Sequence, residues 1–573
     1  CGLGQFHQNE LVCSCIICTI IRDMDRKNNK FSKKLMAAAL AVIFQPSYSL
    51  AQADANMTAQ ENINRAMQTP AAQSEFTPAS KRVQQPTLVL PDLGDSSSAS
   101  LAPVDERQLG ERIMREIRRD PDYSSDPVFY DYLNNIGQHL VSAARKQGIA
   151  GLQGGGSFAV NFELFGVRDK SINAFALPGG FIGVHTGLIV SAETESELAS
   201  VLGHEIGHVT QKHIARMYGQ QGTNSMIALA SIILAALAVS RNPNAAQGLA
   251  VGGQALAIQN QLSYSRDAER EADRVGFQIL QASGFDVQGM PDFFQRMQRA
   301  NSIMESGVPG YVRTHPLTTD RIADMQDRVR GLATQKVSSS IEFYLLKARA
   351  RLTQTTSSSN YPELRQYYES LLRKQDLAKQ LEGSYGLALL SFKQLKNVDA
   401  ENYLQKSRAL VQSMSSNGSP VQRWSLSLET TAIELMFAKS QYEQGVKQII
   451  NLKAFYPQSR SLNMLLIEGQ LKTGQHEQAI AWLKTESRAH PENSVWWDLL
   501  SRAYAQSGKK SLHHAALAEK YVSQGAWVGA LEQMKFAKAA GDADFYQASE
   551  IEARARQIQE LYRQELRAEN KRP

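Results

Sequence analysis

Apolar residues recur on a helical period where the ordered part of the chain is expected to begin. Within residues 105–119 they would share one helix face: Leu109, Ile113, Met114 and Ile117. A second helix is predicted from Asp126 to Lys146. Residues 54–104, in contrast, are rich in Gln, Ser, Thr, Pro and Ala and show no period, which predicts a disordered linker.

The period changes between residues 158 and 165, where apolar and polar residues alternate as in a β-strand. Residues 173–188 then suggest two short strands broken by a Pro-Gly-Gly turn. Helices are predicted after these strands at 194–217, 246–262, 265–283, 287–303 and from about residue 319. This order of elements predicts a mainly α domain with a small β-sheet over residues 105–336.

Beyond residue 336 the chain has the pattern of paired helices that repeat. QYEQG at 441–445 matches QHEQA at 475–479, and Gly474 and Gly508 are separated by the same offset. A helix–turn–helix period of about 34 residues is typical of tetratricopeptide repeats. An unrelated helical bundle with a chance match is the alternative. We therefore expect residues 337–570 to form a helical repeat solenoid of this type, with a concave surface for partners.

A targeting signal is predicted near the start of the chain. From Met24 a basic segment leads into the ten apolar residues LMAAALAVIF, and a small-residue site follows at Ala51-Gln52-Ala53. We expect residues 1–53 to comprise an upstream segment and a secretory signal peptide; a short buried or anchoring helix is the alternative. All four cysteines lie within residues 1–18, in apolar surroundings that disfavour a metal cluster. Because they precede the expected cleavage site, the mature chain would use no disulfides.

Charge and hydropathy argue against two classes of protein. The net charge is +6, of which +3 belongs to residues 1–53, and so balanced a remainder does not indicate a nucleic-acid partner. The apolar stretch MIALASIILAALAV at 226–239 is too short to span a bilayer. It predicts a buried or hairpin helix, with a membrane-surface or partner-binding helix as the alternative.

Residues 201–210 (VLGHEIGHVT) contain the pattern HExxH. On a helix, His204 and His208 lie one turn apart on the same face, so the two imidazoles can hold one zinc ion. Glu205 lies about 100° around the helix, where it cannot chelate with them but can accept a proton from water activated by the metal. Zinc lowers the pKa of such a water to about 7. The pattern therefore predicts a zinc-dependent protease.

The site needs a third protein ligand, and an acidic helix supplies a candidate. In SRDAEREADRVG at 265–276, Glu269 and Asp273 share one face, so Glu269 can bind the metal while Asp273 orients a ligand imidazole. A solvated charged helix is the alternative. Glu271 points away from that face and is expected to be solvated. His213, the next histidine after the HExxH pattern, is expected to lie on the surface.

HEIGHV followed some sixty residues later by EREADRVG resembles the CAAX-processing, HtpX and Oma families of zinc metallopeptidases, whose pattern is HExxH with a later ExxxD. The resemblance implies zinc ligands, a base and a supporting carboxylate: His204, His208 and Glu269, then Glu205, then Asp273. Within this group the chain is most similar to a periplasmic subfamily of Gram-negative bacteria. There a zincin-like peptidase domain, here about 105–335, precedes C-terminal tetratricopeptide repeats, here about 340–565.

Two further segments resemble that subfamily. In RTHPLTTDR at 313–321, the resemblance implies His315 as a fourth ligand that keeps the enzyme quiet by filling the open position of the metal; a plain loop histidine is the alternative. Arg321 would help to hold the site. The strands at 173–188 are similar to an active-site edge strand, which can pair with an extended substrate. The candidate substrate contacts are Asn173, Phe181 and Gly183, while His185 would be structural.

The resemblance implies a periplasmic zinc metalloendopeptidase, with one Zn²⁺ per chain, that degrades misfolded or stalled outer-membrane β-barrel proteins and assists their assembly like a chaperone. The tetratricopeptide repeats would dock the outer-membrane assembly machinery, and peripheral contact with the outer membrane is also expected. No nucleic-acid partner is expected. The alternative is a chaperone or assembly factor whose zinc site is largely silent, a hypothesis that the repeats and His315 also support.

Overall fold

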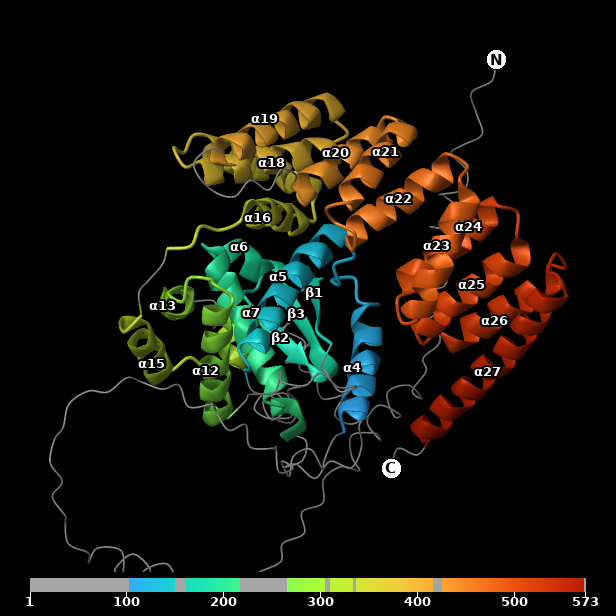
Figure 1. Ribbon diagram of the computed structural model, residues 1–573, viewed down its shortest axis with the longest axis horizontal. Helices are drawn as coiled ribbons and strands as arrows, with labels where there is room; N and C mark the ends of the chain where they lie inside the picture. The colour runs from blue at the N-terminus through green and yellow to red at the C-terminus, as the bar shows by residue number, and fades with distance from the viewer. Residues whose placement is uncertain are drawn as a thin grey trace, which may run out of the picture. The chain divides into compact units, whose positions relative to one another are not determined.

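The computed structural model describes residues 102–149, 161–216, 265–303, 310–332, 336–415 and 425–570 (Figure 1). The described residues up to Tyr562 fall in one compact unit. Several expectations lie outside the described residues: the signal peptide, nearly all of the linker, the four cysteines, and the helices expected at 226–239 and 246–262. Among the described residues, no helix combines the length and the apolar character that a membrane crossing requires.

Three strands in the described residues form a small mixed sheet: β1 (Glu163–Val167), β2 (Ala174–Leu177) and β3 (Phe181–His185). Their order is β1-β3-β2, with β3 parallel to β1 and antiparallel to β2. The prediction of two strands around Pro-Gly-Gly is confirmed, because the 3-10 turn η1 (Pro178–Gly180) joins β2 to β3. Gly179 in this turn has a φ of +76°, and a Cβ there would lie 2.8 Å from the Cα of Arg107. Only glycine fits both conditions.

The helices around this sheet begin at capping residues that the sequence supplies. In chain order they are α4 (Pro103–Ile117), α5 (Pro127–Lys146), α6 (Thr186–Ser191), α7 (Glu195–Thr210), α12 (Arg266–Ala282), α13 (Gly289–Ile303), α14 (Gly310–Thr314) and α15 (Thr319–Arg330). The side chains of Thr194, Ser265 and Thr318 each accept a hydrogen bond from a backbone N–H in the first turn of α7, α12 and α15. The predicted helices in these regions are therefore confirmed.

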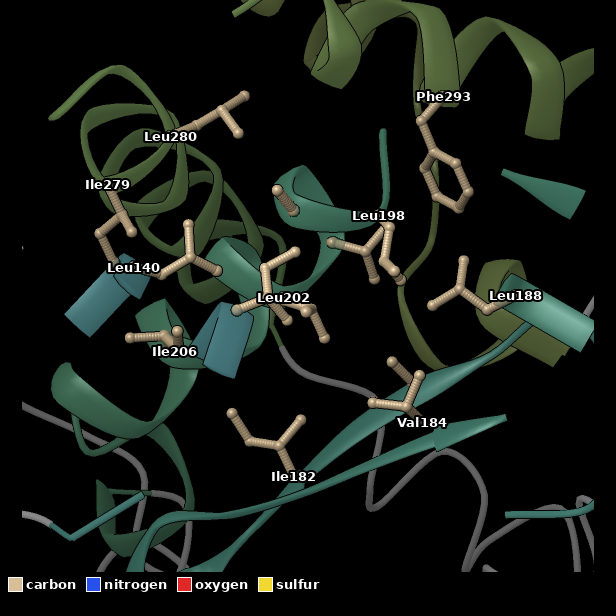
Figure 2. Packing of buried hydrophobic residues seen from close by; sticks show 14 of the residues in the cluster. Leu140, Ile182, Val184, Leu188, Leu198, Leu202, Ile206, Ile279, Leu280 and Phe293 are labelled. Atoms are coloured by element: carbon tan, nitrogen blue, oxygen red, sulfur yellow. The ribbon is translucent and has the colours of Figure 1, made fainter. Parts of the chain in front are cut away.

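Apolar side chains from α5, the sheet, α7, α12 and α13 meet in one core (Figure 2). Leu140 of α5, Ile182 of β3, Leu202 of α7, Ile279 of α12 and Phe293 of α13 are all fully buried there. α7 passes through this core, and every one of its residues is buried. Polar side chains on α7 are therefore removed from bulk water, which strengthens their electrostatic interactions.

Glycines let the main chains of α7 and α12 touch. A Cβ added at Gly276 of α12 would lie 2.8 Å from the backbone nitrogen of His204, closer than real Cβ atoms approach. A Cβ at Gly203 or Gly207 of α7 would lie 3.1 Å or 3.0 Å from a backbone oxygen of α12. Because nothing larger than hydrogen separates the two helices at these positions, residues on their facing sides can reach one common point.

Several boundaries differ slightly from the predictions, and two differ by five residues or more. β1 begins at Glu163 rather than at residue 158, although residues 150–160 lie outside the described chain. α7 ends at Thr210 rather than near Met217, because Lys212 takes a left-handed conformation with φ of 52°, and residues 213–216 then form a separate helical turn. This second difference changes where the residues after α7 point.

Beyond residue 336 the described elements are helices: α16 (Ile341–Thr353), η2 (Ser358–Asn360), α17 (Tyr361–Leu372), α18 (Leu377–Lys393), α19 (Asn397–Ser415), α20 (Leu426–Ala438), α21 (Tyr442–Lys453), α22 (Arg460–Lys472), α23 (His476–Ala489), α24 (Ser494–Gln506), α25 (Lys510–Ser523), α26 (Trp527–Ala539) and α27 (Phe545–Asn570). Successive helices pack side by side, as α24, α25 and α26 show in Figure 1. The predicted period is confirmed, because α20, α22 and α24 begin at equal intervals along the sequence, and α21, α23 and α25 begin at the same interval. Ser440, Gly474 and Gly508 share this spacing and all have positive φ.

Asp131 of α5 connects the first group of helices to this C-terminal array. Its buried carboxylate accepts hydrogen bonds from the hydroxyls of Ser459 and Ser461, at 2.7 and 2.6 Å, and from the backbone N–H groups of Arg460 and Ser461, at 2.7 and 3.0 Å. These N–H groups open α22 and have no carbonyl of their own helix to bind. A side chain from a distant part of the sequence therefore caps this helix.

We expect Asp131→Ala to lower the free energy of unfolding by about 2–3 kcal/mol, because it leaves several buried donors without an acceptor. Urea unfolding of the whole chain measures this loss. Asp376→Ala is the control, since Asp376 accepts a hydrogen bond within the first turn of its own helix, α18, and a local cap contributes about 1 kcal/mol. Equal losses in the two variants would contradict the connecting role of Asp131.

Candidate active site

α7 and α12 bring the predicted metal ligands together. His204 and His208 project from α7, one turn apart, and Glu269 projects from the first turn of α12. His315 follows α14 and reaches the same point from another direction. All four side chains are buried, with residue exposures of at most 1%. The structure therefore brings four residues that are far apart in the sequence into one cluster.

The atoms of these residues that can bind a metal converge. His204 Nε2 lies 3.0 Å from His208 Nε2 and 3.3 Å from His315 Nδ1. Glu269 Oε1 lies 3.0 Å from His315 Nδ1 and 3.4 Å from His208 Nε2. A tetrahedron whose vertices are about 2.0–2.1 Å from its centre has edges of about 3.3 Å. The spacing and the mixture of imidazole and carboxylate donors therefore fit a four-coordinate zinc ion.

Glu205 lies beside this cluster rather than within it. Its side chain is fully buried, with Oε1 3.4 Å from His315 Nε2, and neither carboxylate oxygen accepts a well-formed hydrogen bond from the described residues. Burial raises the pKa of Glu205 above its ordinary value, although the nearby His315 and His204 oppose the rise. A buried carboxylate with a raised pKa is suited to taking up a proton.

Asp273 and Arg321 contact the ligand side chains and hold them in position. Asp273 Oδ1 lies 2.9 Å from His204 Nδ1, and Arg321 donates two hydrogen bonds to Asp273, at 2.6 and 2.8 Å. Another nitrogen of Arg321 lies 2.8 Å from Glu269 Oε2. Burial would raise the pKa of Asp273, but the hydrogen bonds from Arg321 and His204 hold it below its ordinary value. Asp273 thus has the position that orients a ligand imidazole.

The expectation for His213 is wrong, and that for Glu271 holds only in part. His213 is 3% exposed, and its Nδ1 lies 2.8 Å from Nδ1 of His208. The expectation assumed one continuous helix, whereas the turn at Lys212 directs His213 back toward the cluster. The Glu271 side chain is only 27% exposed and interacts with both His213 and Arg216.

An edge strand lies within residues 173–188 as expected, but Phe181 and Gly183 are not part of it. Both residues belong to β3, whose main chain pairs with β1 on one side and β2 on the other. Phe181 lies under the guanidinium of Arg107, and Gly183 makes room for the ring of Phe175, which a Cβ would meet at 2.3 Å. β2 is the edge strand that packs against α7. Asn173, just before β2, is buried, and its Oδ1 has no hydrogen-bond partner among the described residues.

Sequence reasoning missed Tyr311. Its ring stacks on His315 with centroids 4.8 Å apart, and its backbone carbonyl accepts the N–H of His315 at 2.8 Å. Its hydroxyl is buried without a hydrogen-bond partner in the described part of the chain. The available signal was its position four residues before His315, the spacing that places two residues on one face of a helical turn.

Comparisons with known proteins agree with this site. Residues 142–329 match peptidase family M48. The chain is 31% identical over 479 residues to the beta-barrel assembly-enhancing protease of Escherichia coli O157:H7, covering 82% of this chain and 91% of that protein. It is 29% identical over 474 residues to the protein of the same name from Yersinia pestis, covering 82% and 92%. It is also 29% identical over 217 residues to the mitochondrial metalloendopeptidase OMA1 of Bos taurus, covering 38% of this chain and 40% of that protein.

The prediction of a zinc-dependent protease is confirmed by these matches. The M48 region runs from within α5 to within α15 and so contains the whole buried cluster that could hold a metal ion. The longer similarity covers 82% of the chain and therefore extends well beyond the M48 region. The chain is a zinc metalloprotease of peptidase family M48 and belongs to the family of the beta-barrel assembly-enhancing proteases.

Proposed function

We propose that this chain is a periplasmic zinc endopeptidase that cleaves misfolded or stalled outer-membrane proteins and assists β-barrel assembly. The observation that carries the proposal is the convergence of His204, His208 and Glu269 on one point with the buried Glu205 beside it. The name of the relatives supports the substrate class, because the similarity covers 91% of the Escherichia coli protein. The predicted signal peptide supports the location.

In this proposal His204, His208 and Glu269 hold the zinc ion, which supplies the Lewis acidity that lowers the pKa of water and polarises a peptide carbonyl. Glu205 accepts a proton from the attacking water on a carboxylate oxygen and then donates it to the leaving amine nitrogen. Its raised pKa favours the first of these transfers, the uptake of the proton from water. Asp273 Oδ1 lies 2.9 Å from His204 Nδ1, where it would accept the Nδ1–H and so keep Nε2 free to bind the metal.

We place the substrate backbone along β2. β2 is an edge strand beside α7. The backbone of its residue Ala176 is close enough to Glu205 to oppose the rise in the pKa of that carboxylate. An extended peptide can add to such an edge through main-chain hydrogen bonds, which recognise unfolded chain regardless of sequence. Asn173 at the start of β2 would accept a substrate N–H with its unpartnered Oδ1.

His315 favours a second candidate function, that of an assembly factor whose protease is latent. A catalytic zinc site has three protein ligands and one open position. Here His315 Nδ1 lies at the fourth corner of the cluster, and its Nε2 faces Glu205. An imidazole bound there would keep both water and a peptide carbonyl from the metal, and the enzyme would stay inactive until the loop that follows α14 moved.

We expect His315→Ala to increase the cleavage of an unfolded protein several-fold, because it opens the fourth position. The rate is measured by release of peptides from a fluorescently labelled unfolded chain, with zinc content determined in parallel. His185→Ala is the control, since His185 is also buried and hydrogen-bonded, to Ser171, but lies outside the cluster. An unchanged or lower rate with zinc retained would show that His315 does not block the site.

The proposed function is tested with the full chain and an unfolded outer-membrane β-barrel protein as substrate. Cleavage that stops with a chelator, returns with added zinc and is absent in His208→Ala supports the endopeptidase. Faster cleavage of the unfolded barrel than of the same barrel folded in detergent supports the substrate class. If neither the parent nor His315→Ala cleaves any unfolded protein while zinc is bound, the assembly factor replaces the protease as the primary function.

A further inference from the structure

We propose that His213 is a positioning residue that fixes the imidazole of His208 for zinc. The inference rests on the proposed ligand role of His208. Nδ1 of His213 lies 2.8 Å from Nδ1 of His208, and Nε2 of His213 lies 3.1 Å from Oε2 of Glu271. The same oxygen accepts a hydrogen bond from Arg216 at 2.6 Å. A chain of hydrogen bonds, called a line below, therefore runs outward from the metal cluster through four side chains: His208, His213, Glu271 and Arg216.

The positions of the hydrogens in this line follow from the metal end. Nε2 of His208 faces the cluster, so it must present a lone pair there, and the neutral imidazole then carries its hydrogen on Nδ1. That N–H donates to Nδ1 of His213, which must be unprotonated. His213 then carries its hydrogen on Nε2 and donates to Glu271, which can only accept. One set of tautomers satisfies every group in the line.

The other zinc-binding histidine has a comparable support. His204 has its Nδ1 at 2.9 Å from Asp273, and Asp273 is held by Arg321. Both ligand imidazoles therefore lead outward to a carboxylate that is paired with an arginine. The difference is that His213 stands between His208 and its carboxylate. Such partners fix the ring orientation and tautomer of a metal-binding histidine, and losing one typically costs about 10–100-fold in metal affinity.

The turn before His213 gives an independent reason to assign it a role. Lys212 has a φ of 52°, a left-handed conformation that L-residues with a side chain rarely adopt. This turn ends α7 and brings His213 back beside His208, whereas a continued helix would carry it away. A strained turn that aims a buried, polar side chain at a metal ligand is a feature expected of a functional position.

The test measures zinc affinity of the full chain by competition with a chromophoric chelator. We expect His213→Ala to weaken zinc binding by about 10–100-fold. His213→Asn should recover most of this loss, because its amide oxygen can occupy the position of Nδ1 and accept the same hydrogen bond. The visible absorption of the Co²⁺-loaded chain should shift in His213→Ala and return toward that of the parent in His213→Asn. His185→Ala, the loss of a buried histidine elsewhere in the same domain, should leave both readouts unchanged.

The outcomes separate this inference from the proposed function. If His208→Ala weakens zinc binding but folded His213→Ala binds zinc within twofold of the parent, the positioning role is wrong and the ligand assignment stands. If His208→Ala itself leaves zinc binding unchanged, the proposed site fails. Should His213→Ala not fold, Glu271→Ala tests the outer link of the same line. In that case a several-fold loss of zinc affinity in Glu271→Ala supports the inference, and an unchanged affinity overturns it.

Discussion

Replacing Glu205 by Gln is expected to lower the rate of peptide hydrolysis by about 10²–10⁴-fold while zinc stays bound. The amide has nearly the shape of the carboxylate but cannot take up the proton of the attacking water. Because Glu205 lies beside the cluster rather than within it, the ligand atoms that hold the metal are unchanged. The measurement is the kcat for an unfolded substrate, in the His315→Ala background if the parent is latent, together with metal content.

Glu195→Gln is the matched control for this prediction. It is the same substitution on the same helix, at a buried glutamate that binds Tyr132 and Ser340 rather than the cluster. This variant is expected to lose stability but to keep its kcat per folded molecule. A Glu205→Gln enzyme that retains a tenth or more of the parental kcat would mean that another group transfers the proton.

Arg321→Met is expected to lower the free energy of unfolding of the metal-free chain by about 3–5 kcal/mol, because it leaves two buried carboxylates without their cation. Arg321 is 3% exposed and lies 2.6 and 2.8 Å from Asp273 and 2.8 Å from Glu269. Methionine keeps much of the apolar stem, so most of the loss reports on the charge. Zinc should reduce the loss, since its positive charge lies beside Glu269.

Arg328→Met provides the comparison on the same helix. Arg328 pairs with Asp324 at 3.1 Å, but the two side chains are 35% and 46% exposed. Exposed pairs contribute about 0–1 kcal/mol, so this variant should unfold almost like the parent. Urea unfolding with and without zinc measures both variants. A loss below about 1 kcal/mol for metal-free Arg321→Met would show that the buried carboxylates find another partner or take up protons at little cost.

The parts of the site that follow from helix geometry were predictable from the sequence. The spacing of His204 and His208, and that of Glu269 and Asp273, fixes each pair on one helix face wherever the helices lie. The distance between the two pairs was not predictable in this way, because it depends on how α7 and α12 pack. The repeat period was predictable because the same helix pair recurs at a constant interval along the chain.

The wrong expectations share a cause, which is that each depends on contacts or turns that carry no clear signal in the sequence. The end of α7 is set by a left-handed lysine, Lys212, at a position where glycine is the usual marker. Phe181 and Gly183 lie in a strand, as predicted, but its central place depends on pairing with β1, which comes from another part of the chain. A strand pattern gives the existence of a strand and not its neighbours.

The glycine contact between α7 and α12 has a consequence for the choice of metal. Because Gly203, Gly207 and Gly276 let the two backbones touch, the gap between the histidine pair and Glu269 is set by the main chain rather than by adjustable side chains. Calcium prefers oxygen ligands at about 2.3–2.6 Å, whereas this cluster offers mainly imidazole nitrogens, and the packed core resists a wider separation of the two helices. The close crossing of α7 and α12 therefore favours an ion with short ligand bonds, such as zinc. Three glycines outside the ligand set thus contribute to the choice of metal by fixing how closely α7 and α12 approach.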